Sequence, residues 1–522
     1  MKNTILTSIK QPKILLLIGI VILAILLRLP MLGWYIGDSG FVSIYSRSIY
    51  ERSLGIRYSY SGYAMAQKDN YAPLYYLIVA LFYRLFGVTY LHGCIVTFIF
   101  GVSTVPATYL LASNIYGQRE GLISALVISI LPWHIVYCGI VLIDPVVTFF
   151  MTISVIAFLK ALKTEKWSDY LIFGFVTGLS YLTKIYAIIL FPIFFLSLIL
   201  HYFHLREKGK IIASSFRVNL VRFLLSSILS FMMLSPWLLN AGIMKITTHE
   251  AIVTLLDPTI KISPLYSVEF LAMELKFMLI VFFLGIIKVF YDKDGRGLLL
   301  FTLILVPFAG YTVLAYNFRI LHAFWNFPRY VSITIPPMCI LISKGIDCVH
   351  DFSYNMYRYF PHSLQPLLQK TKRYRLLMLG NKKLQLLGYT VLLFCCLFLV
   401  TRYYRLLLIG QVYFHGTEHI GDRQEVIEMT CRYIEVYLPQ GSIIVADNVD
   451  IFWIAEFYLN PQMEIRSKED ISRIISSSIT KFYLIAYSPN PHISHSLKVT
   501  LLFTAYNIDH PNMNGYLYEL IV

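Results

Sequence analysis

The sequence predicts an α-helical polytopic membrane protein that ends in a small soluble α/β domain. Of its 522 residues, 57% are hydrophobic and only 14% are charged, whereas soluble proteins carry about 25% charged residues. Apolar runs of 16 to 25 residues recur along the first 410 positions, and a helix needs about 20 residues to cross a bilayer. After residue 410 these long runs stop, and shorter strand-like and helix-like patterns replace them.

Eleven segments within residues 1–410 are apolar enough to be full membrane spans. They lie near residues 14–34, 91–113, 120–138, 144–162, 169–184, 185–204, 218–240, 269–290, 298–316, 329–347 and 386–409. No small-residue cleavage site follows the first of them, so we interpret it as an uncleaved anchor rather than a signal peptide. Residues 1–410 therefore form the predicted membrane domain.

Four clusters of Lys and Arg orient these spans. They occupy residues 2–13, 160–166, 206–222 and 348–385. Because cytoplasmic loops carry an excess of basic residues, all four clusters should be cytoplasmic. This holds only if the apolar segment Tyr71–Phe86 is a short helix at the outer face or half-way into the membrane, rather than a full span. The odd number of spans then predicts a cytoplasmic N-terminus and an external C-terminal segment.

The C-terminal segment 411–522 is predicted to be a separate extracytoplasmic α/β domain. It holds 7 Lys or Arg against 13 Asp or Glu, a net charge of −6, which leaves +21 for the rest of the +15 chain. Strand-like runs alternate with helix-like stretches. The predicted strands are 442–446, 482–487, 499–506 and 516–522, and the predicted helices are 450–459 and 468–478. Without a phosphate-binding glycine loop or a metal motif, this domain is interpreted as a docking or specificity module.

Charge and cysteine content exclude two other classes of protein. The basic balance follows from cytoplasmic loops, and no basic groove interleaved with aromatic residues occurs in a soluble segment, so no nucleic-acid partner is expected. The seven cysteines include no CxxC pair and no zinc-ligand spacing. We interpret them as small apolar core residues.

Two carboxylates lie at the outer boundary of the predicted membrane domain. Asp38 follows the first span in the long outer loop 35–72, and Asp144 opens a later span just before Pro145. An ionisable group at the membrane boundary is a functional candidate, because its burial costs free energy unless it is paired or hydrated. A structural role is open for both. Asp144 before Pro145 is a good helix N-cap, and Asp38 in a Gly-Asp-Ser-Gly run is suited to a turn.

Two basic residues also reach the predicted outer face. Lys184 lies where one span ends and the next begins, and Arg329 lies at the start of an inward span. Basic residues on the outer face are unusual, because Lys and Arg are enriched in cytoplasmic loops. They would bind a lipid phosphate there, or they would snorkel to lipid headgroups.

The order of short motifs resembles a known family. These motifs are Asp38, Ala72-Pro73-Leu74, Ile115-Tyr116-Gly117-Gln118-Arg119, Leu131-Pro132-Trp133-His134, Asp144, Thr183-Lys184 and Pro328-Arg329-Tyr330. Over roughly residues 14–350 the chain is similar to the superfamily of protein O-mannosyltransferases and lipid A aminoarabinose transferases, glycosyltransferase families 39 and 83. The resemblance implies the GT-C fold of integral-membrane glycosyltransferases.

The resemblance also implies a reaction and its residues. The donor would be a polyprenyl-phosphate sugar, of the dolichyl or undecaprenyl type, and an inverting transfer to an acceptor hydroxyl would take place on the outer membrane face. Asp38 takes the position of the catalytic base, and Asp144 that of a second outer acidic residue. Lys184, Arg329 and Lys68 match positions near the donor phosphate. No metal or other cofactor is expected to be required.

The chain departs from the family pattern at informative points. Many relatives have Asp-Glu where this chain has Asp38-Ser39. Either Glu51 or Asp144 would then supply a second carboxylate. Many relatives also have Pro-Pro-Leu where this chain has Ala72-Pro73-Leu74. A Trp-Trp-Asp signature of oligosaccharyltransferases is absent from the sequence, which argues against transfer of a preassembled glycan to asparagine.

Three other classes of function stay open at this stage. A flippase for polyprenyl-linked sugars would bind its substrate at the midplane, whereas these charged residues lie at the outer boundary. A polysaccharide polymerase or ligase would carry its large outer loop late in the chain. A structural assembly factor would use only the acidic tail. Neither the sugar nor the acceptor (a lipid, a protein or a glycan) follows from the residues. Modest loops and the lack of an endoplasmic reticulum retention signal favour a prokaryotic plasma membrane.

Overall fold

The computed structural model describes most of the helical region and the C-terminal sheet. The described residues are 12–33, 37–54, 72–207, 213–241, 275, 278–292, 294–317, 332–358, 420–447, 449–459, 463–476, 479–487, 489, 497–505 and 514–521. The chain divides into two compact units. The first comprises Met1–Pro30, Phe100–Tyr137 and Asp144–Ile409, and the second comprises Met31–Ile99, Cys138–Ile143 and Gly410–Val522.

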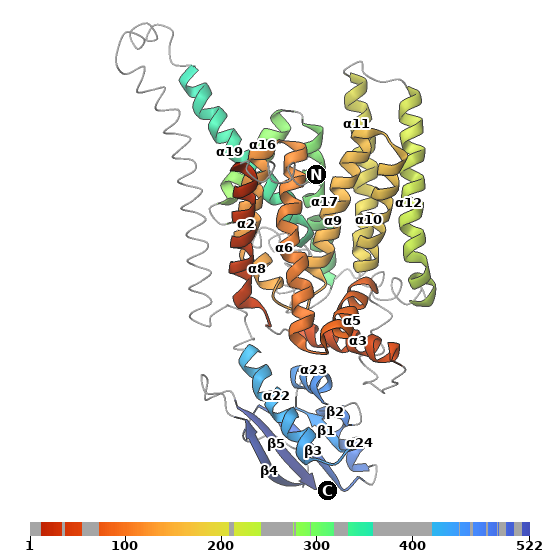
Figure 1. Cartoon of the computed structure of the whole chain (residues 1–522), viewed down its shortest axis with the longest axis vertical. Coiled ribbons are helices and arrows are strands. Elements are labelled where there is room, and N and C mark those ends of the chain that lie inside the picture. Colours follow the sequence, from red (N-terminus) through yellow and green to blue (C-terminus); the bar gives the residue numbers. More distant parts are fainter. Residues whose placement is uncertain are drawn as a thin grey trace, which may run out of the picture. The chain divides into compact units, whose positions relative to one another are not determined.

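The first unit is helical (Figure 1). Its described elements are α2 (Pro12–Arg28), most of α6 (Tyr90–Ile115), α7 (Gln118–Ile130), α8 (Pro132–Tyr137), α9 (Asp144–Thr164), α10 (Trp167–Thr183), η3 (Ile185–Ile189), α11 (Leu190–Glu207), α12 (Ala213–Ala241), α16 (Met278–Tyr291), α17 (Gly295–Asn317), η4 (Ser332–Thr334) and α19 (Ile335–Arg358). Within the described residues, five helices are long and apolar enough to cross a membrane: Lys13–Met31, Tyr90–Ile115, Asp144–Thr164, Ile185–Tyr202 and Phe216–Leu239. The prediction of a helical membrane protein is confirmed.

Several boundaries differ from the sequence prediction. The segment 120–138 is not one helix but α7 followed by the short helix α8. The break falls at Leu131-Pro132 because proline has no N–H to donate into the preceding turn and starts a new helix well. The segment 185–204 opens with the 3-10 turn η3. The predicted span 386–409 lies outside the described residues.

Two glycines allow a close helix crossing in the first unit. Gly285 of α16 and Gly345 of α19 face each other's backbone. A Cβ atom at Gly285 would lie 1.9 Å from the carbonyl oxygen of Leu341, and one at Gly345 would lie 1.8 Å from that of Val281. No side chain fits at these distances, so glycine at both positions is required for this backbone approach.

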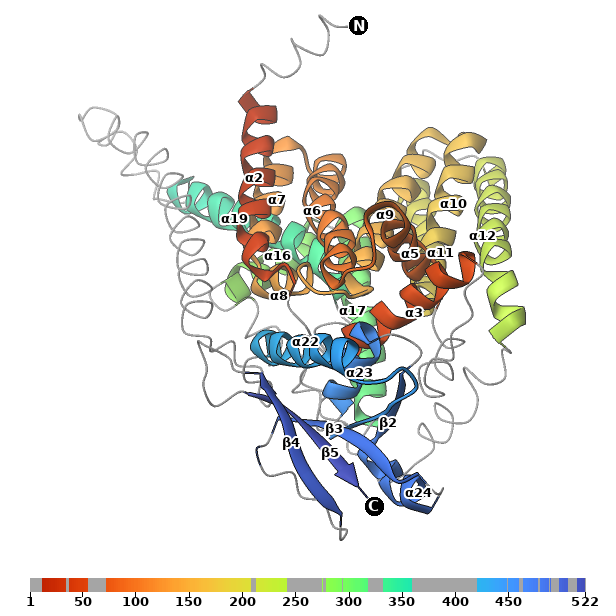
Figure 2. The same ribbon diagram turned by 60° about the horizontal axis from the view of Figure 1, so that its bottom comes forward.

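The second unit contains the C-terminal α/β domain (Figure 2). Its elements are α22 (Ile420–Tyr437), β1 (Ile443–Ala446), α23 (Val449–Tyr458), β2 (Glu464–Ser467), η5 (Lys468–Asp470), α24 (Ile471–Ser476), β3 (Lys481–Ala486), β4 (Lys498–Ala505) and β5 (Gly515–Ile521). The strands form one sheet in the order β2-β1-β3-β5-β4. The β1 strand is parallel to β2 and β3, whereas β5 is antiparallel to β3 and β4. The predicted strands and helices are confirmed, and α22 and β2 are additional.

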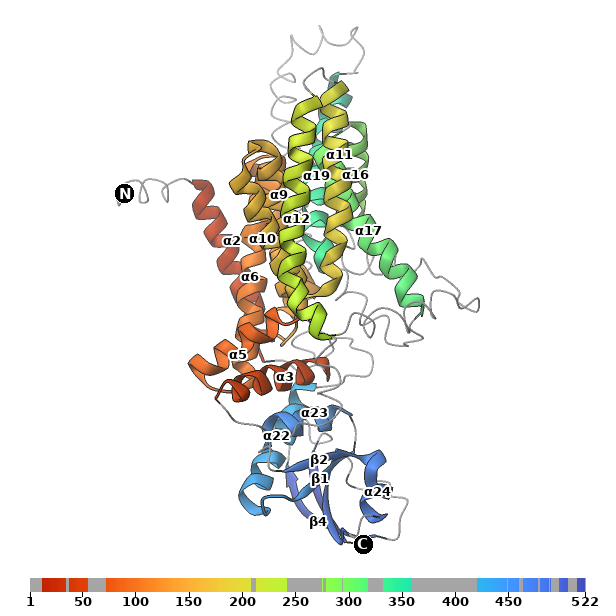
Figure 3. The same ribbon diagram turned by 90° about the vertical axis from the view of Figure 1, so that its right-hand side faces the viewer.

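Two helices close to the start of the chain belong to the same second unit. These are α3 (Gly37–Ser53) and α5 (Leu74–Phe86). Figure 3 shows α3 beside α23 of the C-terminal domain. The predicted outer loop 35–72 contains a helix over residues 37–53, and Asp38 lies in the first turn of this helix rather than in a turn between elements. At 13 residues, α5 is shorter than the roughly 20 residues of a full span.

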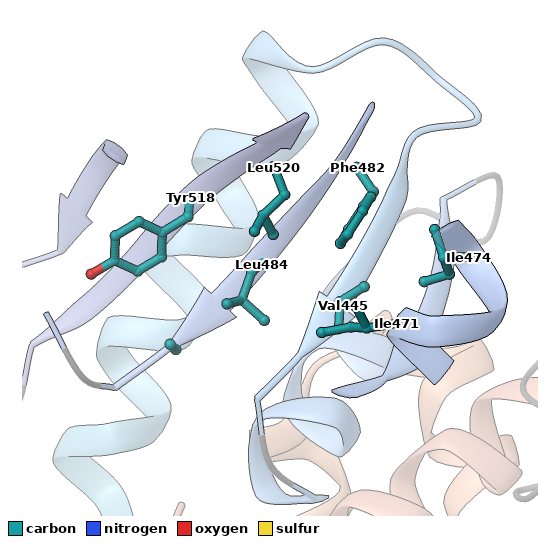
Figure 4. Packing of buried hydrophobic residues seen from close by; sticks show 8 residues of the cluster. Val445, Ile471, Ile474, Phe482, Leu484, Tyr518 and Leu520 are labelled. Carbon is teal, nitrogen blue, oxygen red and sulfur yellow. The ribbon is translucent and has the colours of Figure 1, made fainter. Parts of the chain in front are cut away.

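The C-terminal domain has an apolar core on one face of its sheet. Helix α24 contributes Ile471 and Ile474, which contact Val445, Phe482 and Leu484 from the strands (Figure 4). All are buried. Because strand side chains alternate, the neighbouring strand residues face the other side, where α22 contacts β4 and β5 and α23 contacts β1 and β2. The predicted division of the chain at residue 410 lies outside the described residues and stays a prediction.

Candidate active site

The first unit holds a buried ion pair between two of the predicted site residues. The Lys184 ammonium Nζ donates to Asp144 Oδ1 over 2.7 Å, and the side chains are 12% and 0% exposed. Asp144 is the first residue of α9, and Lys184 directly follows α10. Lys184 also lies over the ring of Tyr186, with its Nζ 4.8 Å from the ring centroid.

A helical hairpin brings these two residues together from positions 40 apart in the sequence. Helices α9 and α10 are joined by a tight turn in which Glu165 has a positive φ of 53°. The hydroxyl oxygens of Ser154, midway along α9, and Ser180, in the last turn of α10, lie 3.0 Å apart. Two antiparallel helices of 21 and 17 residues return the chain to the end where it started, since each residue adds about 1.5 Å of rise.

A hydroxyl contact ties this ion pair to the turn before α19. Thr148 Oγ1 donates to the backbone oxygen of Asp144 over 2.8 Å and lies 3.0 Å from Ser332 Oγ in η4. Ser332 follows the Pro328-Arg329-Tyr330 motif by two residues. Arg329 itself lies outside the described residues, as does Lys68.

The other predicted acidic residues lie on α3 in the second unit. Asp38 is the second residue of this helix, and its side chain is outside the described part of the structure. Glu51, buried at 6% exposure, accepts a hydrogen bond of 2.8 Å from Arg47 Nε. Burial raises the pKa of Glu51, and the Arg47 guanidinium opposes that rise. Glu51, named as an alternative second carboxylate, is thus part of an ion pair.

A buried arginine that sequence reasoning did not single out lies in the first unit. Arg28 is 0% exposed and donates to the backbone oxygens of Ala24, Ile128 and Ser129 at 2.9–3.1 Å. Its Nη2 lies 2.6 Å from His134 Nδ1. The carbonyls of residues 128 and 129 are among the last of α7, where no helical donor remains. The signal was present in the sequence, because Arg28 interrupts an apolar run.

The Ile115–Arg119 motif has a structural explanation. Arg119 Nη1 lies 3.1 Å from Asp347 Oδ1 of α19, and Lys344 Nζ lies 4.7 Å from the centroid of the Tyr116 ring. The turn between α6 and α7 is therefore fastened to α19, and this motif needs no catalytic role.

Neither a metal site nor a disulfide occurs in the described part of the chain. Within it, no three His, Cys, Asp or Glu side chains gather as a metal site would require. Within it, Cys94, Cys138, Cys339 and Cys431 are buried and form no disulfide, as expected for small apolar core residues.

Part of the sequence matches a known protein family, and the fold is similar to solved structures. Residues 70–239 match the family described as dolichyl-phosphate-mannose-protein mannosyltransferase. No curated protein matches the sequence significantly. Among solved structures, ArnT from Cupriavidus metallidurans is similar in its apo state, with 13% identity, 97% of both chains covered and a TM-score of 0.62. Its complex with undecaprenyl phosphate gives a TM-score of 0.58 at the same identity and coverage.

A second similar structure is an oligosaccharyltransferase. AglB from Archaeoglobus fulgidus, in complex with an inhibitory peptide and a dolichol-phosphate, has 12% identity and a TM-score of 0.54 over 91% of this chain and 69% of that chain. The chain therefore has the fold of these membrane glycosyltransferases. The resemblance predicted from the motifs is confirmed: residues 70–239 match the family of dolichyl-phosphate-mannose-protein mannosyltransferases, and the chain has the GT-C fold of ArnT.

Proposed function

We propose that this protein is an inverting glycosyltransferase that moves a sugar from a polyprenyl-phosphate donor to an acceptor hydroxyl on the outer membrane face. The buried ion pair of Asp144 and Lys184 carries the proposal. It holds an ammonium group in a fixed direction at one end of a helical hairpin, in a chain with the ArnT fold. The ArnT and AglB structures with undecaprenyl phosphate and dolichol-phosphate support the donor class.

The proposed reaction assigns one bond change to each group. The Asp38 carboxylate removes the proton of the acceptor hydroxyl. The acceptor oxygen then attacks the anomeric carbon from the face opposite the phosphate, and the bond between that carbon and the phosphate oxygen breaks. The electron pair leaves with the polyprenyl phosphate. General-base help of this kind is worth about 10²–10⁴-fold in rate.

Charge on the departing phosphate is the second task. Lys184, with Arg329 and Lys68, stabilises it electrostatically. Asp144 acts through Lys184, because its carboxylate is fully buried against that ammonium. A lysine ammonium has three donors on a flexible stem, so a fixed carboxylate partner determines which way it points.

The proposed topology puts this chemistry outside the cytoplasm. It comprises eleven full spans, the half-membrane helix at Tyr71–Phe86, a cytoplasmic N-terminus and an external domain at 411–522, in a prokaryotic plasma membrane. The short length of α5, 13 residues, supports its assignment as the half-membrane helix. Cysteine labelling from either side of sealed vesicles tests the orientation.

The first experiment compares wild-type protein with Asp38→Asn. Purified protein in nanodiscs receives a radiolabelled polyprenyl-phosphate sugar (mannose, glucose or aminoarabinose) and total membrane acceptors. Label should enter an acceptor with the wild type and fall at least 100-fold with Asp38→Asn, which keeps the size of the side chain. Full activity of the variant would exclude Asp38 as the base. Label that merely crosses the bilayer would identify a flippase instead.

Metal dependence is tested in the same assay. We expect transfer to continue after treatment with EDTA, since electrostatic stabilisation by Lys and Arg needs no ion. A loss of transfer that added Mg²⁺ or Mn²⁺ restores would contradict this expectation.

A further inference from the structure

We propose that Arg47 is a positioning residue, which fixes helix α3 to the C-terminal domain so that Asp38, at the start of α3, is held in place for the reaction. The C-terminal domain would then contribute to catalysis without touching the substrate. This inference rests on the proposed function, because it assumes that Asp38 is the base.

The contact joins two segments that are 410 residues apart in the sequence but belong to one compact unit. Arg47 Nη1 donates a short hydrogen bond to the backbone oxygen of Phe457, while its Nε donates to Glu51 over 2.8 Å. The Arg47 side chain is 16% exposed. Helices α3 and α23 lie side by side in all three views (Figures 1, 2 and 3).

The acceptor is the carbonyl of Phe457, which has no hydrogen-bond donor within helix α23. Phe457 is the second-last residue of α23, and the last four carbonyls of a helix have no intrahelical donor. A cation there also interacts favourably with the negative end of the helix dipole. Arg47 therefore caps α23, and Glu51 orients the guanidinium from one turn further along α3.

Apolar contacts surround this polar one. Phe457 is 4% exposed, and its ring meets that of Tyr90 edge-on, with centroids 6.3 Å apart. On another side of α3, Tyr45 meets Tyr76 of α5 edge-on with centroids 4.6 Å apart. Helix α23 in turn contacts β1 and β2. The sheet is thus connected through α23 to the helix that carries Asp38.

Helix geometry sets the expected size of the effect. Arg47 and Asp38 are nine residues apart, or about 14 Å along the helix axis at 1.5 Å per residue. A tilt of α3 by about 5° at Arg47 would move Asp38 by about 1 Å, and a misplacement of that size costs up to roughly 10²-fold in rate. A contact remote from Asp38 can therefore change the reaction rate.

The test compares Arg47→Met with Arg432→Met. Methionine keeps most of the length of the side chain but removes its charge and its donors. Arg432 is the matched control: it lies in the same compact unit and pairs with Glu428 over 2.5 Å at i,i+4, but its side chain is 75% exposed. Two quantities are measured, namely amide hydrogen exchange in α3 and α23, and kcat and KM for a polyprenyl-phosphate sugar donor.

With Arg47→Met we expect exchange in α3 to quicken about tenfold or more and kcat to fall roughly 10- to 100-fold, while the donor KM changes less than threefold. Arg47→Lys, which keeps the cation near the end of α23, should recover part of kcat. Arg432→Met should change none of these quantities.

Unchanged exchange in Arg47→Met would overturn the contact itself. Faster exchange with unchanged kcat would overturn the positioning role, as would a raised donor KM with normal kcat. If the wild type transfers no sugar, the proposed function fails and the positioning role fails with it, whereas the exchange data still decide whether α3 is fixed to α23.

Discussion

The helical unit and the C-terminal α/β domain differ in the apolar side chains that they expose and in the charges that they bury. In the helical unit, Met232 and Ile280 are 64% and 69% exposed, while Arg28 and Asp144 are completely buried. In the domain, Phe482 and Leu484 are completely buried, and the Arg473 side chain is 85% exposed. Exposed apolar helix faces suit lipid, where burying them against protein gains little. The domain instead follows the ordinary rule for proteins in water.

This difference shows which interactions fix the arrangement of the helices and strands in each region. Buried charges in the helical unit must be paired to persist, so every such pair fixes a particular helix arrangement. Arg28 fixes the end of α7, and Asp144 with Lys184 fixes the mouth of the α9–α10 hairpin. In the domain, the packing of apolar side chains fixes the arrangement of the elements, and charged pairs on its surface contribute little to stability.

Asp144→Ala should have the largest effect on stability and on sugar transfer. This change leaves the Lys184 ammonium buried without its carboxylate, which costs about 3–5 kcal/mol when one partner of a buried pair is removed. We expect a large drop in the apparent melting temperature in detergent and at least a 100-fold loss of sugar transfer. Asp347→Ala serves as the control, since its partner Arg119 is 42% exposed, and its loss should be much smaller.

The double variant Asp144→Ala/Lys184→Met sharpens this result. It removes both charges, so much of the lost stability should return, whereas transfer should stay low because the phosphate has lost its cation. Recovery of full transfer in the double variant would exclude Lys184 from the donor site.

Truncation of the domain core by Phe482→Ala tests the opposite rule. A fully buried phenylalanine removed from a packed core costs about 3–5 kcal/mol, from lost burial and from the cavity that remains. The domain should therefore unfold at lower denaturant concentration while the helical unit keeps its own transition. Val499→Ala on β4, where the valine is 43% exposed, should change stability by less than about 0.5 kcal/mol.

Arg28→Met should have an intermediate effect. It removes the donors to the carbonyls of Ile128 and Ser129, and a buried carbonyl left unpaired costs about 1–3 kcal/mol. Hydrogen exchange near the end of α7 should quicken, and the melting temperature should fall. A stability equal to wild type would mean that Arg28 is not needed to cap this helix.

The smallest expected effect concerns Glu51→Gln and pH. Burial raises the pKa of Glu51 in the folded protein above its value of 4.5, so the folded state binds its proton more tightly than the unfolded state does. This group therefore favours folding more as the pH falls through its raised pKa. Wild type should gain stability relative to Glu51→Gln between pH 7 and pH 5, and a loss over that range would contradict the cause assigned here.

Most of the architecture followed from patterns that need no tertiary contact. Apolar runs, positive clusters and alternating strands predicted the membrane helices and the sheet strands β1, β3, β4 and β5, because each depends on burial in lipid or on a local period. Helix α3 was missed because its polar residues give no apolar stripe. Its Ser43, Ser46 and Ser48 side chains are nevertheless buried, in a helix that contacts α5 and α23. Strand β2 was missed because Ile465 is the one apolar residue among its four, whereas the equally short β1 is apolar throughout.

The sequence by itself determined which residues were candidates for chemistry: Asp38, Asp144, Lys184 and Arg329 stood out as charges next to apolar spans. Only the tertiary structure decided the partners. It paired Asp144 with Lys184, and it bound Arg47 to the end of α23. The physical reason is that a burial cost is visible in one dimension, whereas the group that offsets it comes from a segment tens to hundreds of residues away.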